Sequence, residues 1–420
     1  MSDHGRAAPV DRTHRIRPMT GRDPHERGRT ATTLELLYDL VFVVAIGQAA
    51  NQLAHLVAEG HYAAGIGAFA FAMFAVMWAW INFSWFASAF DTDDWPYRLA
   101  TMVQMVGVTI LGLGLPQMFH SIDVGHGIDN RIMVAGYVVM RVAMVFQWMR
   151  AARQSPAHRA ACLVYAKVIV LAQIGWLAAT FVHLALVPTL LILVALLFFE
   201  LGGPYLAETR YGGTPWHAHH MAERYGLLAI IALGEGVVGT VASLSAVVEA
   251  QGWTTDAILV AVAGMGLTFG MWWCYFMLPV GEILHVRRAR GFMWGYGNMP
   301  VLAAIAATGA GLHVAALFIE HKAHIGPVAT VLALAIPVAV YLVGVYLMYS
   351  GLLADVDPFH ALLITLTAMV LVAGPLLAAL GVSMAVCLLV VMLAPAVTVV
   401  GYEVRGHRRV AEAVERMLRD

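Results

Sequence analysis

Hydrophobic positions along this chain form long, nearly continuous runs that short polar segments separate. A helix needs about 20 apolar residues to cross the hydrocarbon core of a bilayer. Runs of this kind do not fit the alternating segments of about ten residues that build an outer-membrane β-barrel. The pattern therefore predicts an all-α polytopic membrane protein. It places about twelve transmembrane helices over residues 34–57, 62–88, 98–119, 131–150, 160–183, 185–202, 219–246, 255–279, 293–319, 327–349, 359–379 and 382–403.

Composition narrows the class of protein further. The 420 residues are 60% hydrophobic and 12% charged, whereas a soluble domain carries roughly 25% charged residues. A net charge near zero gives no indication of a nucleic-acid partner. Cys162, Cys274 and Cys387 lie far apart in apolar stretches, which is typical of small packing residues and not of a disulfide framework or a zinc site. We expect no metal site and no cofactor.

Lysine and arginine set the orientation of the spans, because cytoplasmic loops are enriched in them. With the N-terminus inside, the opposite side receives only Arg131 and Lys322. Both termini are then cytoplasmic. We expect a disordered, arginine-rich tail over residues 1–30, a first six-helix half over 31–210, a second half over 211–404 and a cytoplasmic C-terminal tail over 405–420.

The two halves share a weak internal repeat. An offset of 187 places Tyr38 on Tyr225 and places Gly47-Gln48 on Gly234-Glu235. Because six helices per half is an even number, the halves would be parallel repeats about an axis along the membrane normal. In transporters built this way, the binding sites lie near mid-membrane at the interface between the halves.

Three blocks of sequence resemble the bacterial low temperature requirement A (LtrA) proteins. They are ELLYDLVFVVAIGQ at 35–48, WAWINFSWFASAFDTDDWPYRL at 78–99 and ERYGLLAIIALGEGVV at 223–238. The resemblance implies a multi-pass protein of the inner (cytoplasmic) membrane, in a family named for a growth phenotype in the cold. It implies no established substrate and no catalytic residue.

Ionisable side chains inside the spans are the candidate site, because a charge at mid-membrane costs about 2.5–3.5 kcal/mol on insertion scales. Asp39 and Glu235 are the titrating candidates, and Gln48 is the repeat counterpart of Glu235. Structural alternatives stay open: an ion pair for Asp39, and an interhelical hydrogen bond for Glu235. Arg141 is predicted to pair with Asp39 or Glu235 because its guanidinium can hold a carboxylate with two hydrogen bonds.

For other polar residues, the sequence gives weaker support for a place in the candidate site. Thr32-x-x-Glu35 has the pattern of a capping box, so Glu35 is most economically a helix cap. Lys167 lies within reach of the cytoplasmic surface and can extend its amine there. The remaining members of this group are a polar face of the first span and two charges at the start of the seventh: Asn51, Gln52 and His55, then Glu223 and Arg224.

The leading hypothesis is a proton- or ion-coupled secondary transporter of unknown substrate. An ion channel with a two-times-six helix architecture is the alternative. A membrane-embedded enzyme acting on lipid is a weaker one, and we expect no catalytic residue and no enzymatic activity. The expected partners are the lipid bilayer and a small-molecule or ion substrate, with no nucleic acid. The coupling ion, the direction of transport and the formation of a homo-oligomer stay open.

Overall fold

The computed structural model describes residues 16–125, 127–181, 186–353 and 358–419. Over these ranges the chain is helical and contains no strand. Twelve long helices are α1 (Thr33–Ala58), α2 (Tyr62–Phe90), α3 (Trp95–Asp123), α4 (Arg131–Gln154), α5 (Arg159–Phe181), α6 (Leu186–Arg210), α7 (Ala218–Gln251), α8 (Thr255–Tyr275), α10 (Gly291–Ile319), α11 (Pro327–Leu353), α12 (Pro358–Ala379) and α13 (Met384–Gly401). Two shorter helices are α9 (Val280–Val286) and α14 (His407–Arg419).

The twelve spans predicted from hydropathy are confirmed in number and order. Twelve helical segments of the described chain are long and apolar enough to cross a membrane. The eighth span differs at its end, because α8 stops at Tyr275 and the chain resumes as α9 after Pro279. Proline has no backbone N–H to continue a helix, so an apolar run that includes it can be helical on both sides and still broken.

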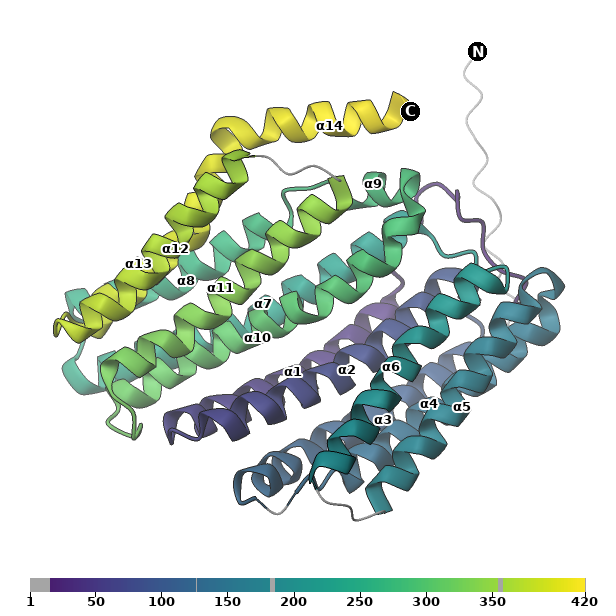
Figure 1. The fold of residues 1–420 in the computed structure, drawn as a ribbon, viewed down its shortest axis with the longest axis horizontal. Helices are drawn as coiled ribbons and strands as arrows, with labels where there is room; N and C mark the ends of the chain where they lie inside the picture. Colours follow the sequence, from purple (N-terminus) through teal and green to yellow (C-terminus); the bar gives the residue numbers. More distant parts are fainter. Residues whose placement is uncertain (1–15, 126, 182–185, 354–357, 420) are drawn as a thin grey trace.

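The helices form two groups that meet at α1. Helices α3, α4, α5 and α6 pack in chain order, and so do α10, α11, α12 and α13 (Figure 1). Helix α1 contacts α2 and α3 on one side and α7 and α10 on the other. The two-fold repeat itself stays a prediction, although this matching order of neighbours agrees with it.

Glycine allows the central helices to approach closely. A Cβ atom added at Gly309 of α10 would lie 2.7 Å from the backbone of Glu235, and one added at Gly311 would lie 2.6 Å from the carbonyl oxygen of Ala333. Small residues permit such backbone contacts between membrane helices. Helix α10 is therefore held tightly between α7 and α11.

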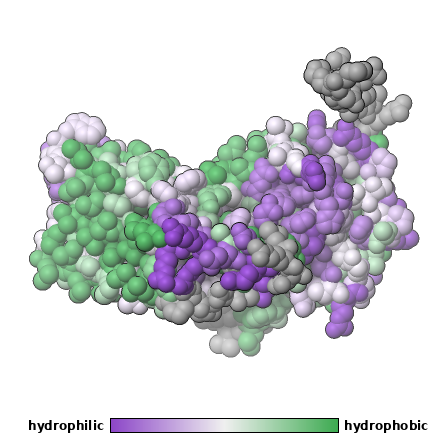
Figure 2. All heavy atoms as spheres, turned by 90° about the horizontal axis from the view of Figure 1, so that it is seen from above, coloured by the Kyte–Doolittle hydropathy of each residue, from purple (hydrophilic) through white to green (hydrophobic). Residues whose placement is uncertain are grey.

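One end of the bundle carries α9, α14 and the segment that precedes α1 (Figure 1). Seen from this end, hydrophilic residues gather over the centre and right of the molecule, and hydrophobic residues cover its left flank (Figure 2). The charged residues that lie at this end, as their contacts show, include Arg22, Arg29, Asp91, Arg150 and Arg288.

The expectation of a disordered tail is wrong for residues 16–30, and residues 1–15 lie outside the described ranges. The Met19 N–H donates to Gln154 Oε1 at 2.7 Å, and the Arg22 N–H donates to the Ala89 carbonyl at 2.9 Å. The Arg29 guanidinium donates to the Ala87 carbonyl at 3.0 Å. The arginine content alone could not show that these groups find partners at the ends of α2 and α4.

Candidate functional site

Helix α1 begins with the predicted capping box. Thr32 Oγ1 accepts the Glu35 N–H at 3.3 Å, and Glu35 Oε2 accepts the Thr32 N–H at 2.8 Å. This local motif fixes Glu35 in the first turn. Asp39 then follows one turn deeper on the same face, since residues four apart are neighbours on a helix surface.

Arg224 of α7 joins these two carboxylates. One guanidinium nitrogen donates to Glu35 Oε1 at 2.7 Å and the other donates to Asp39 Oδ1 at 2.6 Å. All three side chains are 0% exposed. A planar guanidinium presents its N–H groups as a fork, so it can bridge two carboxylates one helical turn apart. The bridge connects the first group of helices to the second.

His220 and Trp80 complete the surroundings of the carboxylates. His220 Nε2 lies 3.2 Å from Glu35 Oε1, and the Trp80 indole N–H donates to Asp39 Oδ1 at 2.7 Å. We call Glu35, Asp39, His220 and Arg224 the charge cluster. Three of its atoms are enclosed and have no hydrogen-bond partner in the described chain: Asp39 Oδ2, His220 Nδ1 and Arg224 Nε.

The charge cluster holds two carboxylates and one guanidinium. With a neutral His220 its formal charge is −1. The neighbouring pair of Arg29 and Asp91 does not neutralise the charge cluster. These two side chains lie 4.0 Å apart and carry one charge of each sign. Burial raises the pKa of Asp91 to about 6, so at neutral pH this pair remains ionised. A buried, uncompensated charge is expensive, so the charge cluster requires one further positive charge.

The predicted role of Arg141 is wrong. Arg141 of α4 donates to Glu200 of α6 at 2.8 Å, and Trp176 of α5 donates to the same carboxylate at 3.1 Å. Hydropathy indicates how deep Arg141 lies in its span but not the direction in which it points. Arg224, placed among the minor candidates, is the cation that meets Asp39.

Glu235 lies deeper in α7, inserted between α1 and α10. A Cβ atom added at Gly47 would lie 2.5 Å from Glu235 Oε1, and Gly309 contacts the Glu235 backbone from the other side. The side chain is half-buried, and no hydrogen bond or ion pair joins it to another described residue. Eleven residues separate it from Arg224, about 16 Å along the helix. The structure thus brings Glu235 against Gly47, the neighbour of its repeat counterpart Gln48.

The polar face of α1 leads from Glu235 towards the far end of the bundle. Gln48, Asn51 and Gln52 are half-buried, whereas His55 is exposed. The His55 ring lies 5.8 Å from the ring of His313 on α10. Sequence reasoning missed His313, because a single histidine in an apolar run gives no signal of its own.

The remaining candidates lie apart from these groups or are neutralised locally. Lys167 is exposed on α5, and Glu223 is half-buried, with no ion pair to another described residue. In the loop after α2, Asp93 pairs with Arg98 at 2.7 Å and Asp94 pairs with Arg150. Local ion pairs therefore neutralise Asp93 and Asp94, which were not among the predicted site residues.

Comparison with known proteins agrees with the resemblance seen in the sequence. The family described as "Bacterial low temperature requirement A protein (LtrA)" matches residues 30–395. One similar protein is the uncharacterized protein RA0937 of Rhizobium meliloti (strain 1021), 26% identical over 298 residues, which are 66% of this chain and 67% of the relative. The family match includes the charge cluster, Glu235 and eleven of the twelve long helices in full. The chain therefore belongs to the bacterial low temperature requirement A family of multi-pass membrane proteins.

Proposed function

We propose that the protein is a secondary transporter that couples movement of a small molecule or ion to protons in the cytoplasmic membrane. The charge cluster carries the proposal. Two carboxylates face one guanidinium, all 0% exposed, at the contact between α1 and α7. An ion-pair network built for rigidity alone would be expected to balance its charges, because an unpaired buried charge is destabilising.

Asp39 is the group that takes up the proton. Its Oδ1 accepts from Arg224 and Trp80, while its enclosed Oδ2 has no partner in the described chain. A charged His220 would bury a second N–H at Nδ1, where no described acceptor lies. Protonation of Asp39 at Oδ2 restores neutrality and keeps both hydrogen bonds to Oδ1, and its O–H then needs water or a ligand as acceptor.

Loss of the proton then changes the contact between the two helix groups. An ionised Asp39 leaves the charge cluster at −1, and the low-dielectric surroundings make that state costly. Separation of α1 from α7, which admits water or a cation, relieves the cost. This is the kind of rigid-body movement between halves by which alternating access operates.

Glu235 is the second proton site. It stands about 16 Å further along α7, in the contact of α1 with α10, and the polar face of α1 continues from it. A proton can therefore be exchanged at two depths on the same pair of helices. The arrangement favours a carrier over an enzyme, because protons exchanged at two depths of one helix pair can be coupled to movement along the spans.

An ion channel is the second candidate function. The row formed by Gln48, Asn51, Gln52 and His55 favours it, because a polar face between packed helices can hold water. A carrier gives saturable flux driven by a pH gradient. A channel gives non-saturating flux driven by voltage.

Purified protein in liposomes that contain a pH-sensitive dye tests the proposal. Sodium, potassium and a panel of radiolabelled amino acids, sugars and organic acids are offered under an imposed pH gradient. Wild type is expected to move at least one of them saturably, together with protons. Asp39→Asn and Glu235→Gln are expected to lose the proton movement.

Glu249→Gln is the matched control, because Glu249 is an exposed carboxylate on the same helix as Glu235. It should behave like wild type. The proposal fails if both pathway variants support every flux that wild type supports, with the same dependence on pH.

A further inference from the structure

A cavity of about 150 Å³ lies beside the break between α8 and α9. Helix α8 ends at Tyr275, and α9 begins at Val280, after Pro279. The first turns of α7 and α10 and the last turns of α11 line the cavity from the other sides. Because α8 stops at this level, the side chains of a further helix turn are missing, and a space between the neighbouring helices remains.

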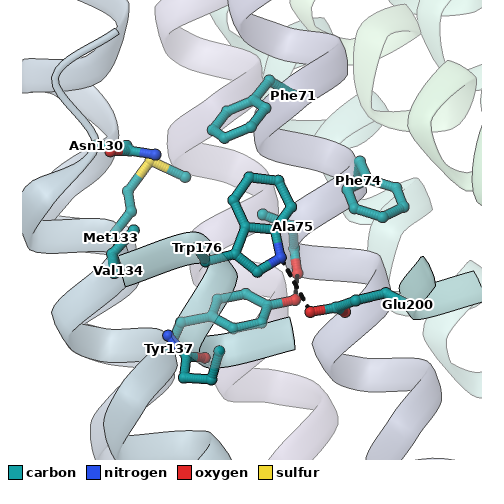
Figure 3. A pocket seen from close by; sticks show the side chains of 10 residues that line it. Phe71, Phe74, Ala75, Asn130, Met133, Val134, Tyr137, Trp176 and Glu200 are labelled. Atoms are coloured by element: carbon teal, nitrogen blue, oxygen red, sulfur yellow. Dashed lines mark hydrogen bonds between the residues drawn. The ribbon is translucent and has the colours of Figure 1, made fainter. Parts of the chain in front are cut away.

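A second cavity, between α2, α4, α5 and α6, is smaller (Figure 3). Its volume is about 40 Å³. In its wall, Glu200 accepts hydrogen bonds from Arg141 at 2.8 Å and from Trp176 at 3.1 Å, and Figure 3 shows Tyr137 and Trp176 pointing towards Glu200. Since one water needs about 10–15 Å³, this cavity has room for a few waters and not for an organic molecule. The larger cavity is therefore the candidate ligand site.

The wall of the larger cavity is mostly aromatic and alkyl surface. No residue that lines it carries a charge. The lining extends from the surface of the protein to its interior, since Phe276 is 39% exposed and Leu352 is 0% exposed. A small molecule can therefore enter without the unfolding of a helix. The apolar side chains of the wall include Phe276, Leu278, Val280, Trp294, Met348 and Leu352.

The two tyrosines in the wall have already used their hydroxyl groups. The Tyr275 hydroxyl donates to Asn298 Oδ1 at 2.7 Å, and the Tyr349 hydroxyl donates to the Tyr275 carbonyl at 3.1 Å. A buried water needs two to four polar partners, so this wall holds water poorly. It presents the tyrosine rings, and not their hydroxyl protons, to a ligand.

We propose that this cavity binds a small, uncharged, apolar molecule about the size of benzene. An apolar cavity of about 150 Å³ inside a protein stays dry and takes up benzene or xenon. Aromatic side chains add edge and face contacts to a flat ring. A charged ligand is disfavoured, because it would be buried without a counter-ion among uncharged residues. No residue of the charge cluster lines the cavity, so the site stands independently of the transport proposal.

Fluorine NMR tests the site directly. Fluorobenzene is added to the purified protein in lipid nanodiscs, and nanodiscs without protein give the resonance of the probe dissolved in lipid. A probe held against the rings of the cavity is expected to give a second, displaced resonance that saturates with one probe bound to each protein. Fluorobenzoate, which has the same ring and a negative charge, should not give this resonance. Fluoroanthracene, which is too large for the cavity, should not give it either.

The variant Ala222→Leu extends a side chain of α7 into the cavity. Fluorobenzene is expected to bind about tenfold more weakly, a loss of about 1.4 kcal/mol. Ala242→Leu is the matched control, because Ala242 is a half-buried alanine on the same helix, as Ala222 is, and does not line the cavity. It should keep the displaced resonance.

Leu352→Ala enlarges the cavity and should change which ring it prefers. Fluoronaphthalene is expected to bind this variant more tightly than it binds wild type, relative to fluorobenzene. A residue with only a structural role would lower the melting temperature without changing this preference. The proposal is overturned if wild type gives no displaced resonance, if Ala222→Leu with cooperative melting binds fluorobenzene as wild type does, or if Leu352→Ala leaves the ring preference unchanged.

Discussion

Arg224 of α7 and Asp39 of α1 form a salt bridge of 2.6 Å although 185 residues separate them in the chain. Both side chains are 0% exposed, and the same guanidinium holds Glu35 at 2.7 Å. This single side chain therefore connects the two groups of helices.

Replacement of Arg224 by methionine should destabilise the protein strongly. Glu35 would lose its cation and Asp39 a hydrogen-bond donor, and breaking a buried ion pair in this way costs about 3–5 kcal/mol. Arg224→Lys should also be destabilising, because an ammonium cannot present a planar fork to both carboxylates. Thermal unfolding of the purified variants measures the effect.

A double-mutant cycle separates the ion pair from packing. Asp39→Asn in the Arg224→Met background should cost much less than expected from the sum of the two single changes. Lys167→Met, which removes an exposed cation, should leave the melting temperature almost unchanged. Strict additivity of the two buried changes would contradict the assigned pairing.

Replacement of Gly309 or Gly47 by alanine should give different results, although both glycines contact Glu235. At Gly309 the new Cβ meets the Glu235 backbone at 2.7 Å, so α7 and α10 must separate. Overpacking of this kind costs about 1–3 kcal/mol. At Gly47 the new Cβ meets the far end of the Glu235 side chain at 2.5 Å, which can turn away.

Gly309→Ala should therefore lower the melting temperature, and Gly47→Ala should change proton movement more than stability. Gly67→Ala on α2 is the control, because nothing lies within 4 Å of its added Cβ. Equal loss of stability at positions 47 and 309 would show that the Glu235 side chain is not where the structure places it.

The ion pair between Asp94 and Arg150 predicts a dependence of stability on pH. Burial acts to raise the pKa of Asp94, but hydrogen bonds from the Arg150 guanidinium and from two backbone N–H groups outweigh it and lower the pKa to about 2. An unfolded aspartate has a pKa of about 3.9. The pairing therefore stabilises the fold fully above about pH 4, and this stabilisation is lost as the pH falls towards 2.

Asp94→Asn keeps the N-cap of α3 but not the charge. It should lower the melting temperature by a few degrees at pH 7, and the difference from wild type should shrink below pH 4. Asp93→Asn, which removes a more exposed partner of Arg98, should have a small effect at every pH. A deficit that stays constant from pH 7 to pH 3 would contradict the ion pair.

The helices were predictable because the bilayer imposes a length and an apolar composition on each span separately. The capping box at Thr32 and Glu35 was predictable for a similar reason, since it depends on residues three apart. The eighth span was predicted to end at residue 279, but the end of α8 at Tyr275 was less visible, because the residues between Tyr275 and Pro279 are equally apolar.

The partners of the buried charges could not be predicted. Hydropathy gives the depth of Arg141 and Arg224 in their spans, but the direction in which each points depends on helix packing. Asp39 was expected to need a cation, and it has one; the cation expected for it, Arg141, binds Glu200 instead. The contact of Glu235 with Gly47 could not be predicted either, because the internal repeat relates Glu235 to Gln48 and Gly47 to Gly234.

The most direct test of the account measures whether Asp39 carries a proton. Infrared difference spectroscopy of the purified protein detects the carbonyl stretch of a protonated carboxyl group, and its shift in D₂O identifies it. At neutral pH wild type should show this band, Glu249→Gln should keep it, and Asp39→Asn should lack the component that exchanges most slowly with D₂O. A wild-type spectrum without a protonated carboxyl group, or an unchanged band in Asp39→Asn, would contradict the claim that the charge cluster binds a proton.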